Sequence, residues 1–237
     1  MYEECSNNFF NLTTCIFEFF MTAPVLYSIR NHHFWLSPEK LIFWEEEKIL
    51  VLSDLHFGKT GHFRKSGIAV PQSVYQQDVL RLFHQISFFN PSKILIVGDF
   101  FHSSENKEMD FFLKWRNDLS YLPFLLVQGN HDILQKEWYF NAGIDVVDQF
   151  KLNSFLFIHD DSTTIQQRDV FTFSGHLHPG CIIRGVGKQS LRFPCFYFTE
   201  QQGILPAFSH FSGLTLVQPK KADHVFAIVN QSIIKIQ

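Results

Sequence analysis

The chain is poor in charged residues and in cysteine. Asp, Glu, Lys and Arg make up 18% of its 237 residues, and the formal net charge at pH 7 is −3. This charge excludes a protein that coats nucleic acid or membrane through its overall field, so any grip on a polyanion must come from a local basic patch. The four cysteines lack the paired spacing of zinc ligands or of a disulfide framework, which indicates reduced thiols in an intracellular, cytoplasmic protein.

The sequence also lacks a clear signal peptide or membrane span. Residues 12–26 are mostly apolar, but Glu18 interrupts them, and Glu3 and Glu4 precede them. A signal peptide begins with positive charge and continues as an unbroken apolar run, and a membrane span is longer. We therefore expect no membrane attachment.

No linker rich in Gly, Ser or Pro divides the chain, and no internal repeat is visible. Residues 1–24 are interpreted as an N-terminal extension. Either the extension packs on the rest of the protein, or residues 1–20 precede a true start at Met21. Residues 25–237 are predicted to form a single domain with a sizeable core.

Hydrophobic side chains are abundant, at 46% of residues, and 29 of them are Phe. Strand and helix patterns alternate in the first half, and the second half is rich in strands. Because strands that are apolar throughout are buried on both faces, the pattern predicts an α/β protein with central sheets covered by helices. The expected strands are 25–29, 34–36, 41–44, 48–53, 93–97, 124–128, 154–158, 170–174, 214–217, 225–229 and 233–236, and the expected helices are 73–89 and 106–119.

Polar blocks follow five of these predicted strands. In open α/β sheets, ligands bind outside the carboxyl ends of the strands, which is where all five blocks lie. Oxygen and nitrogen donors without thiolate favour Mn²⁺, with Fe or Zn²⁺ as alternatives, over Ca²⁺. The blocks contain Asp54 and His56; Asp99; Asn130, His131 and Asp132; His159; and His176 and His178.

The series predicts a site for two divalent metal ions that share a bridging hydroxide, which attacks the phosphorus of a phosphate ester in line. Asp99 would bridge the two ions. His131 would face the substrate as an acid or as a neutraliser of charge, and Asp132 would orient it. One ion would be held by Asp54, His56, Asp99 and His178, and the other by Asp99, Asn130, His159 and His176.

A single histidine is more often a packing or surface residue than a metal ligand. We keep that interpretation for five of the twelve histidines and leave two open. Packing or surface roles are expected for His32, His33, His84, His210 and His224, while His62 and His102 stay undecided.

Basic residues follow the first and last ligand blocks. Lys59 and Arg64 are either solvated surface residues or the holders of a substrate phosphate, which Arg can grip with two hydrogen bonds. His62 and Lys65 would extend this patch. A second patch would consist of Arg184, Lys188 and Arg192.

The ordered blocks from about residue 48 to 178 resemble those of the calcineurin-like metallophosphoesterases. The resemblance implies a two-sheet β-sandwich flanked by helices, with a dinuclear metal centre. A narrower set of motifs resembles the ligase-associated DNA-damage-response phosphoesterases (PdeM-like), and implies a DNA ligase and a helicase as partners. These motifs are residues 52–59, 63–64, 67–71, 98–103, 175–179, 191–196 and 205–208. The run 159–161 departs from that pattern after its histidine, which puts nearby substrate contacts in doubt.

The sequence therefore predicts a metal-dependent phosphodiesterase or endonuclease that acts on DNA in repair. The alternative is a phosphatase or phosphodiesterase for a small molecule with the same metal centre. A binding module that has lost activity would lack ligands of the series, and none is missing.

Overall fold

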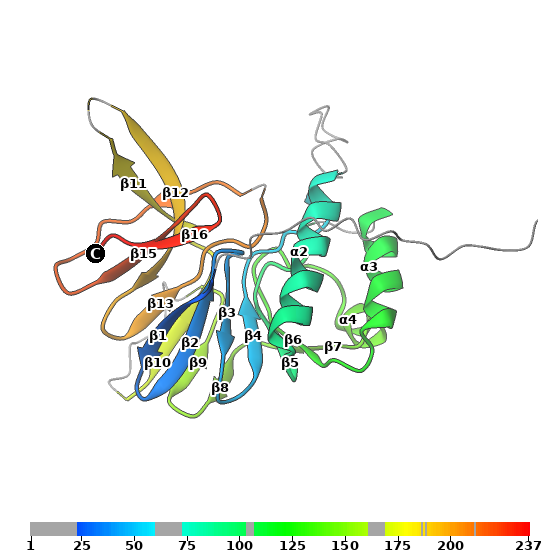
Figure 1. Cartoon of the computed structure of the whole chain (residues 1–237). Coiled ribbons are helices and arrows are strands. Elements are labelled where there is room, and N and C mark those ends of the chain that lie inside the picture. The colour runs from blue at the N-terminus through cyan, green and yellow to red at the C-terminus, as the bar shows by residue number, and fades with distance from the viewer. Residues whose placement is uncertain are drawn as a thin grey trace, which may run out of the picture.

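The computed structural model describes residues 23–59, 73–102, 107–160, 169–185, 187, 189–210 and 212–237 (Figure 1). Of the predicted N-terminal extension, only residues 23 and 24 lie within this part of the chain. No helix in the described ranges is long and apolar enough to cross a lipid bilayer.

The first sheet has seven strands in the order of the chain. Its first four strands are antiparallel neighbours, and its last four are parallel. The carboxyl ends of these four parallel strands therefore meet at one edge. The strands are β1 (Val25–Ile29), β2 (His32–Ser37), β3 (Leu41–Trp44), β4 (Ile49–Leu52), β5 (Lys93–Val97), β6 (Phe124–Val127) and β7 (Ile144–Val147).

The second sheet has nine strands. They are β8 (Phe150–Leu152), β9 (Phe155–Phe157), β10 (Phe171–Ser174), β11 (Pro179–Arg184), β12 (Ser190–Phe198), β13 (Gln202–Ile204), β14 (Thr215–Leu216), β15 (His224–Val229) and β16 (Ser232–Lys235). The order is β14-β11-β12-β13-β10-β9-β8, with β15 between β12 and β16. β10 is parallel to both β9 and β13, so this sheet also presents several carboxyl ends together.

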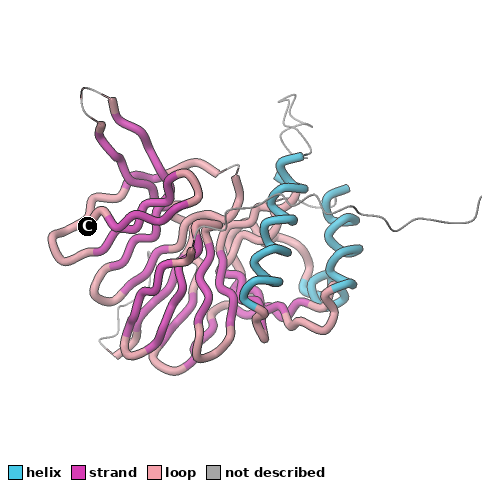
Figure 2. Tube along the Cα trace, in the orientation of Figure 1, coloured by secondary structure: helices cyan, strands magenta, loops and turns pink. Residues whose placement is uncertain are grey.

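Within the described ranges, three helices accompany the sheets: α2 (Ser73–Phe89), α3 (Lys107–Asp118) and α4 (Lys136–Asn141). Figure 2 shows them in cyan on one side of the molecule, with the strands of the second sheet on the other. Alternate residues of β4 explain why that strand is apolar throughout. Leu50 and Leu52 belong to the core under the helices, while Val51 belongs to the core shared with the second sheet. The predicted α/β architecture of two sheets flanked by helices is confirmed.

Phenylalanine fills the core between the sheets. Phe173 on β10 stacks on Phe157 of β9, with ring centroids 5.2 Å apart and planes 7° from parallel. Phe173 also lies 5.1 Å from the ring of Phe34, which comes from the first sheet. Such aromatic pairs add about 0.5–1.5 kcal/mol each beyond the area they bury. They hold together the two edges that carry the polar blocks.

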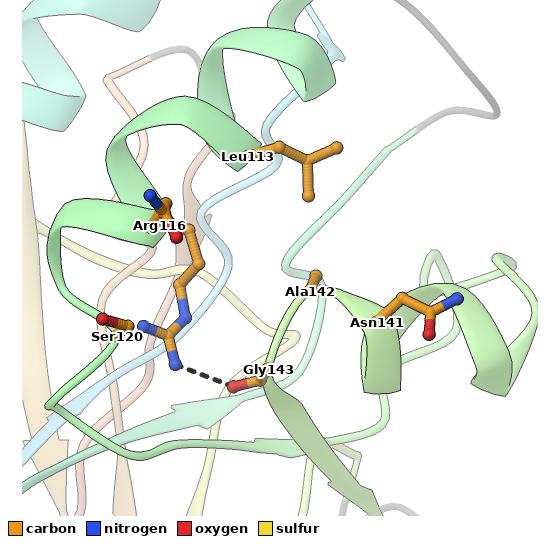
Figure 3. A pocket seen from close by; sticks show the side chains of 7 residues that line it. Leu113, Arg116, Ser120, Asn141, Ala142 and Gly143 are labelled. Atoms are coloured by element: carbon orange, nitrogen blue, oxygen red, sulfur yellow. Dashed lines mark hydrogen bonds between the residues drawn. The ribbon is translucent and has the colours of Figure 1, made fainter.

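A buried arginine closes the carboxyl end of α3. The guanidinium of Arg116 donates hydrogen bonds to the carbonyl oxygens of Leu119 (2.6 Å), Leu122 (3.2 Å) and Gly143 (2.8 Å). Figure 3 shows the bond to Gly143, which ties the helix to the turn before β7. The guanidinium also lies 4.4 Å from the centroid of the Phe124 ring. It thus adds a second donor to the carbonyl oxygen of Leu119, which also accepts from the amide of Leu122, and it supplies a donor to two carbonyl groups beyond the helix end.

Candidate metal centre

The predicted ligands lie just past the carboxyl ends of strands from both sheets. Their ligand atoms gather in two groups, and within each group they lie within 4.8 Å of one another. The first group contains Asp54, His56 and His178, and the second contains Asp99, His159 and His176. The Oδ1 atom of Asn130 joins the second group, 3.1 Å from the Nε2 atom of His159. The structure thus brings all seven predicted ligands together.

Five of the seven predicted ligands have an unusual backbone conformation. Asp54, His56, Asp99, His176 and His178 all have positive φ, between 50° and 63°. A residue with a side chain rarely adopts this conformation, which costs of order 1–3 kcal/mol and persists only where the surroundings hold it. Such residues cluster at functional sites, and here all five belong to one constellation.

Positive φ also corrects one step of the sequence-based argument. Two residues apart in an extended strand, Asp54 and His56 would share a side because side chains alternate along such a chain. They do share a cluster, but their left-handed turns put them there. Backbone hydrogen bonds hold the turns, since the amides of Asp54 and His56 donate to the carbonyl oxygens of Gly98 (3.1 Å) and Asp99 (2.9 Å).

Glycine makes room for this crowding. Gly98 has φ +79°, and a Cβ atom there would collide with the ring of His159. At Gly175, a Cβ atom would collide with the Oγ atom of Ser53 and would lie 2.7 Å from Asp54 Oδ2. The glycines that precede Asp99 and His176 are therefore required by close packing around the ligands.

His159 is held in an orientation typical of a metal ligand. Its Nδ1 atom lies 3.0 Å from the carbonyl oxygen of Val97, to which it donates, so Nε2 points into the cluster, 3.3 Å from Asp99 Oδ1. Metal-binding histidines commonly donate their other ring nitrogen in this way. Burial lowers the pKa of His159, but the bond to Asp99 and the charges of Asp54 and Asp99 outweigh it and raise the pKa to about 9.

The pKa values of His56 and Asp99 are both lowered. Burial, helped by the charge of Lys59, lowers the pKa of His56 to about 2. Burial raises the pKa of Asp99, but the hydrogen bond and charge of His159 outweigh this effect and lower it to about 2. His56 is therefore a neutral imidazole and Asp99 a carboxylate, which are the forms that bind metal.

The donor atoms fit divalent cations. Two nitrogens about 2.1 Å from one ion at a tetrahedral angle are about 3.4 Å apart. His56 Nε2 and His178 Nε2 are 3.4 Å apart, and His159 Nε2 and His176 Nδ1 are 3.3 Å apart. His56 differs from His159 here, since its other ring nitrogen, Nδ1, is buried without a hydrogen-bond partner. A cation in the second cluster would replace the proton that the carboxylates draw onto His159.

His131 lies at the open side of the cluster. Its backbone amide donates to Asp99 Oδ1 at 2.9 Å, and its ring nitrogen Nε2 is 3.9 Å from Asp99 Oδ2. The side chain is 42% exposed. The ring of His102, which the sequence left undecided, lies 4.3 Å from that of His131 and 5.3 Å from that of His56. The signal in the sequence that could have placed His102 near the site was its position three residues after Asp99.

Asp132 contacts backbone rather than the ring that it was predicted to orient. Its buried carboxylate accepts hydrogen bonds from the amides of Gly129 (2.8 Å), Phe100 (2.9 Å) and Phe101 (3.1 Å). Burial raises its pKa to about 6. The carboxylate thus joins the loops that follow β5 and β6, and it acts on His131 only through the backbone.

Of the two predicted phosphate-binding cations, Lys59 is described and Arg64 is not. Lys59 is half-buried beside the first cluster. Burial lowers its pKa, while the charges of Asp54 and Asp99 act in the opposite direction. Arg64 lies outside the described residues, as do His62, Lys65 and Lys188.

Histidines assigned to packing or surface have polar partners away from the clusters, as three of them show. His32 Nδ1 accepts from the indole of Trp44 (3.1 Å), and His210 Nδ1 lies 2.6 Å from Asp78 Oδ1. His224 Nδ1 lies 2.9 Å from a tyrosine hydroxyl. None of the three belongs to either ligand group.

Comparison with known proteins agrees with this geometry. The nuclease MPE of Pseudomonas putida has a similar solved structure, with a TM-score of 0.77 and 25% identity over 90% of this chain and 100% of that one. YfcE, a phosphoesterase from E. coli, is less similar, with a TM-score of 0.42 and 16% identity over 78% of this chain and 96% of that one. No curated relative matches the chain. The model of the calcineurin-like phosphoesterases matches residues 47–226, so the protein belongs to that family and is a metal-dependent phosphoesterase.

Proposed function

We propose that the protein is a nuclease that cleaves phosphodiester bonds of DNA with two metal ions, in the context of repair. The observation that carries the proposal is the pair of ligand groups at one edge of the two sheets. The similarity to a nuclease over almost the whole chain supports a nucleic acid as the substrate. The motifs that resemble ligase-associated phosphoesterases support a role in repair, with a DNA ligase and a helicase as partners, in the cytoplasm.

In this proposal the ligands divide between two ions that share Asp99. Two divalent cations held there, most simply Mn²⁺, would polarise the phosphoryl oxygens and acidify a water molecule enough to supply a nucleophile at neutral pH. Fe and Zn²⁺ satisfy the same donors. The first ion is assigned to Asp54, His56, Asp99 and His178, and the second to Asp99, Asn130, His159 and His176.

His131 is the proposed acid. Its ring is partly exposed, and its amide is fixed to Asp99, so the ring stands over the ligand edge and toward the substrate. From there it can donate a proton to the leaving alkoxide or offset the charge that builds up on it. Asp132 positions the loop that carries His131, through its bonds to backbone amides. Lys59 is proposed to attract the phosphate, together with Arg64.

The open side of the site supports a substrate larger than the site itself. The side chains of His131 and His176 are 42% and 45% exposed. A ligand enclosed by the protein would instead be buried over most of its surface. A small-molecule phosphatase with the same metal centre is the competing function, which the following assay separates.

The test is a set of hydrolysis assays with Mn²⁺ on linear and nicked DNA, bis-p-nitrophenyl phosphate and p-nitrophenyl phosphate. We expect cleavage of DNA and of the diester. His131→Ala should lower kcat by about 10²–10⁴-fold, whereas His33→Ala, at an exposed histidine on β2, should keep the parental rate. Hydrolysis of the monoester alone would refute the nuclease proposal. Full activity of His131→Ala would refute the assigned role.

A further inference from the structure

The hairpin of β11 and β12 extends beyond the rest of the second sheet. In Figure 1 it projects from the body at the upper left. β14 pairs with β11 only at Pro179 and Gly180, and β15 pairs with β12 only from Cys195 onward. Residues 181–184 and 190–194 therefore form a two-stranded ribbon whose outer edges pair with no other described strand. We call these residues the ribbon.

The two faces of the ribbon differ. Antiparallel register places Ile182 opposite Arg192, and Arg184 opposite Ser190. Because successive side chains alternate between faces, these four residues share one face. All four are exposed. The side chains of Cys181, Ile183 and Phe193 lie on the other face, where they join a small core with Val225 and Ala227 of β15. The arginine face is thus the free one.

The guanidinium charges of the two arginines on that face are not paired with other described residues. Within the described part of the chain, neither Arg184 nor Arg192 makes an ion pair or a side-chain hydrogen bond. In a protein of net charge −3, two unpaired guanidinium groups on one projecting ribbon form a local basic surface. Diagonal positions on an antiparallel pair are about 7–8 Å apart, so the two groups can reach separate phosphates.

The ribbon is joined directly to the metal centre. β11 begins at Pro179, the residue after His178. At about 3.3 Å per residue, Ile182 and Arg184 lie about 13–20 Å along the strand from His178. Since B-DNA rises about 3.4 Å per base pair, this reach corresponds to roughly four to six base pairs. A two-stranded ribbon is also narrow enough to enter the major groove of B-DNA.

We propose that the arginine face of the ribbon binds backbone phosphates of duplex DNA, several base pairs from the phosphate that reacts at the metal centre. The proposal rests on the proposed nuclease function and adds to it. It predicts that the substrate must contain a minimum length of duplex beside the reacting phosphate. It also attributes binding free energy for DNA to a part of the fold outside the metal ligands. Contacts with phosphates position a nucleic acid without reading its sequence, so this surface gives no sequence preference.

The test compares Arg184→Gln/Arg192→Gln with the parent protein on a duplex of about 30 base pairs and on bis-p-nitrophenyl phosphate, which is too small to reach the ribbon. The ratio of kcat/KM for DNA to that for the small diester should fall about 10- to 30-fold at ~0.15 M salt. Between ~50 and ~200 mM salt, the slope of log kcat/KM against log salt should become shallower by about 1.8, or ~0.9 for each phosphate that the variant no longer neutralises. Each single Gln variant should make the slope shallower by about 0.9.

Two controls isolate the charge of the ribbon. Arg184→Lys/Arg192→Lys keeps both charges and should keep most of the slope. Lys151→Gln removes an exposed cation from β8, elsewhere in the second sheet, and should leave the ratio unchanged. If the Gln variants kept the ratio and the slope of the parent, the ribbon proposal would be overturned. Absence of DNA cleavage by the parent would refute the nuclease function, and the ribbon proposal with it.

Discussion

Replacing Gly98 with alanine should disable the second ligand group while leaving the fold intact. The Cβ atom of alanine would collide with the ring of His159, so the ring must turn away from Asp99 and from the carbonyl oxygen of Val97. A left-handed φ of +79° adds strain of about 1–2 kcal/mol for a residue with a side chain. Losing the buried hydrogen bond to Val97 costs about 1–3 kcal/mol. We therefore expect a loss of about 2–5 kcal/mol in the free energy of unfolding.

The chain offers a matched control for this change. Gly187 also has a left-handed φ, of +111°, but a Cβ atom there would meet nothing within 4 Å. Gly187→Ala should therefore show only the backbone strain. Gly98→Ala should in addition lower Mn²⁺ affinity at one of the two sites by about 10–100-fold, as displaced supporting groups do at metal sites.

The assays are urea unfolding of the metal-free proteins and Mn²⁺ titration by calorimetry, followed by hydrolysis of bis-p-nitrophenyl phosphate. Gly98→Ala should bind one Mn²⁺ ion tightly and one weakly, and its activity should fall in parallel. Gly187→Ala should bind both ions as the parent does. If Gly98→Ala bound two ions with parental affinity, His159 would not be the ligand that we propose.

Two further predictions concern stability. Arg116→Met should lower the free energy of unfolding by about 2–4 kcal/mol in urea, because the carbonyl groups of Leu122 and Gly143 lose their donor, while that of Leu119 keeps the amide of Leu122; an unchanged midpoint would mean that water replaces the guanidinium. Lys40 tests a buried charge, since burial, together with the charge of Arg81, lowers its pKa from the ordinary lysine value of 10.5 to about 8. The folded state therefore binds the proton of Lys40 less tightly than the unfolded state, so Lys40 should contribute a gain of about 2–3 kcal/mol in stability as pH rises from 8 to 10.5. Lys40→Met should lose this dependence on pH in urea unfolding, and a variant that kept it would exclude Lys40 as its source.

Apolar strands and long helices could be predicted from the sequence. The strands 25–29, 41–44 and 93–97 and the helix 73–89 coincide with β1, β3, β5 and α2. β3 and β5 are buried along most of their length, and such strands leave a continuous apolar run. The helix shows instead through apolar residues at helical spacing.

Other elements gave no such signal. α4 has six residues, too few to show a helical repeat. β11 and β12 contain Pro179, Gly180 and Pro194, which lower the strand propensity of a run. Pro194 is tolerated because it pairs only with Gly180 on one side, before β15 begins its pairing at Cys195. The ribbon is therefore visible only in three dimensions.

The identity of the ligands could be predicted because each follows a strand and has a type that binds metal. Their geometry could not. Positive φ at Asp54 and His178 depends on bonds between loops that are distant in the sequence. Likewise, two of the three backbone partners of Asp132, Phe100 and Phe101, come from the loop after β5, which no local pattern links to it.

The most direct test of the central claim is a crystal structure of the protein with Mn²⁺, in which anomalous scattering locates the ions. We predict two peaks. One should lie within bonding distance of Asp54, His56, Asp99 and His178, and the other within bonding distance of Asp99, Asn130, His159 and His176. A single peak, or a peak away from either ligand group, would contradict the dinuclear centre.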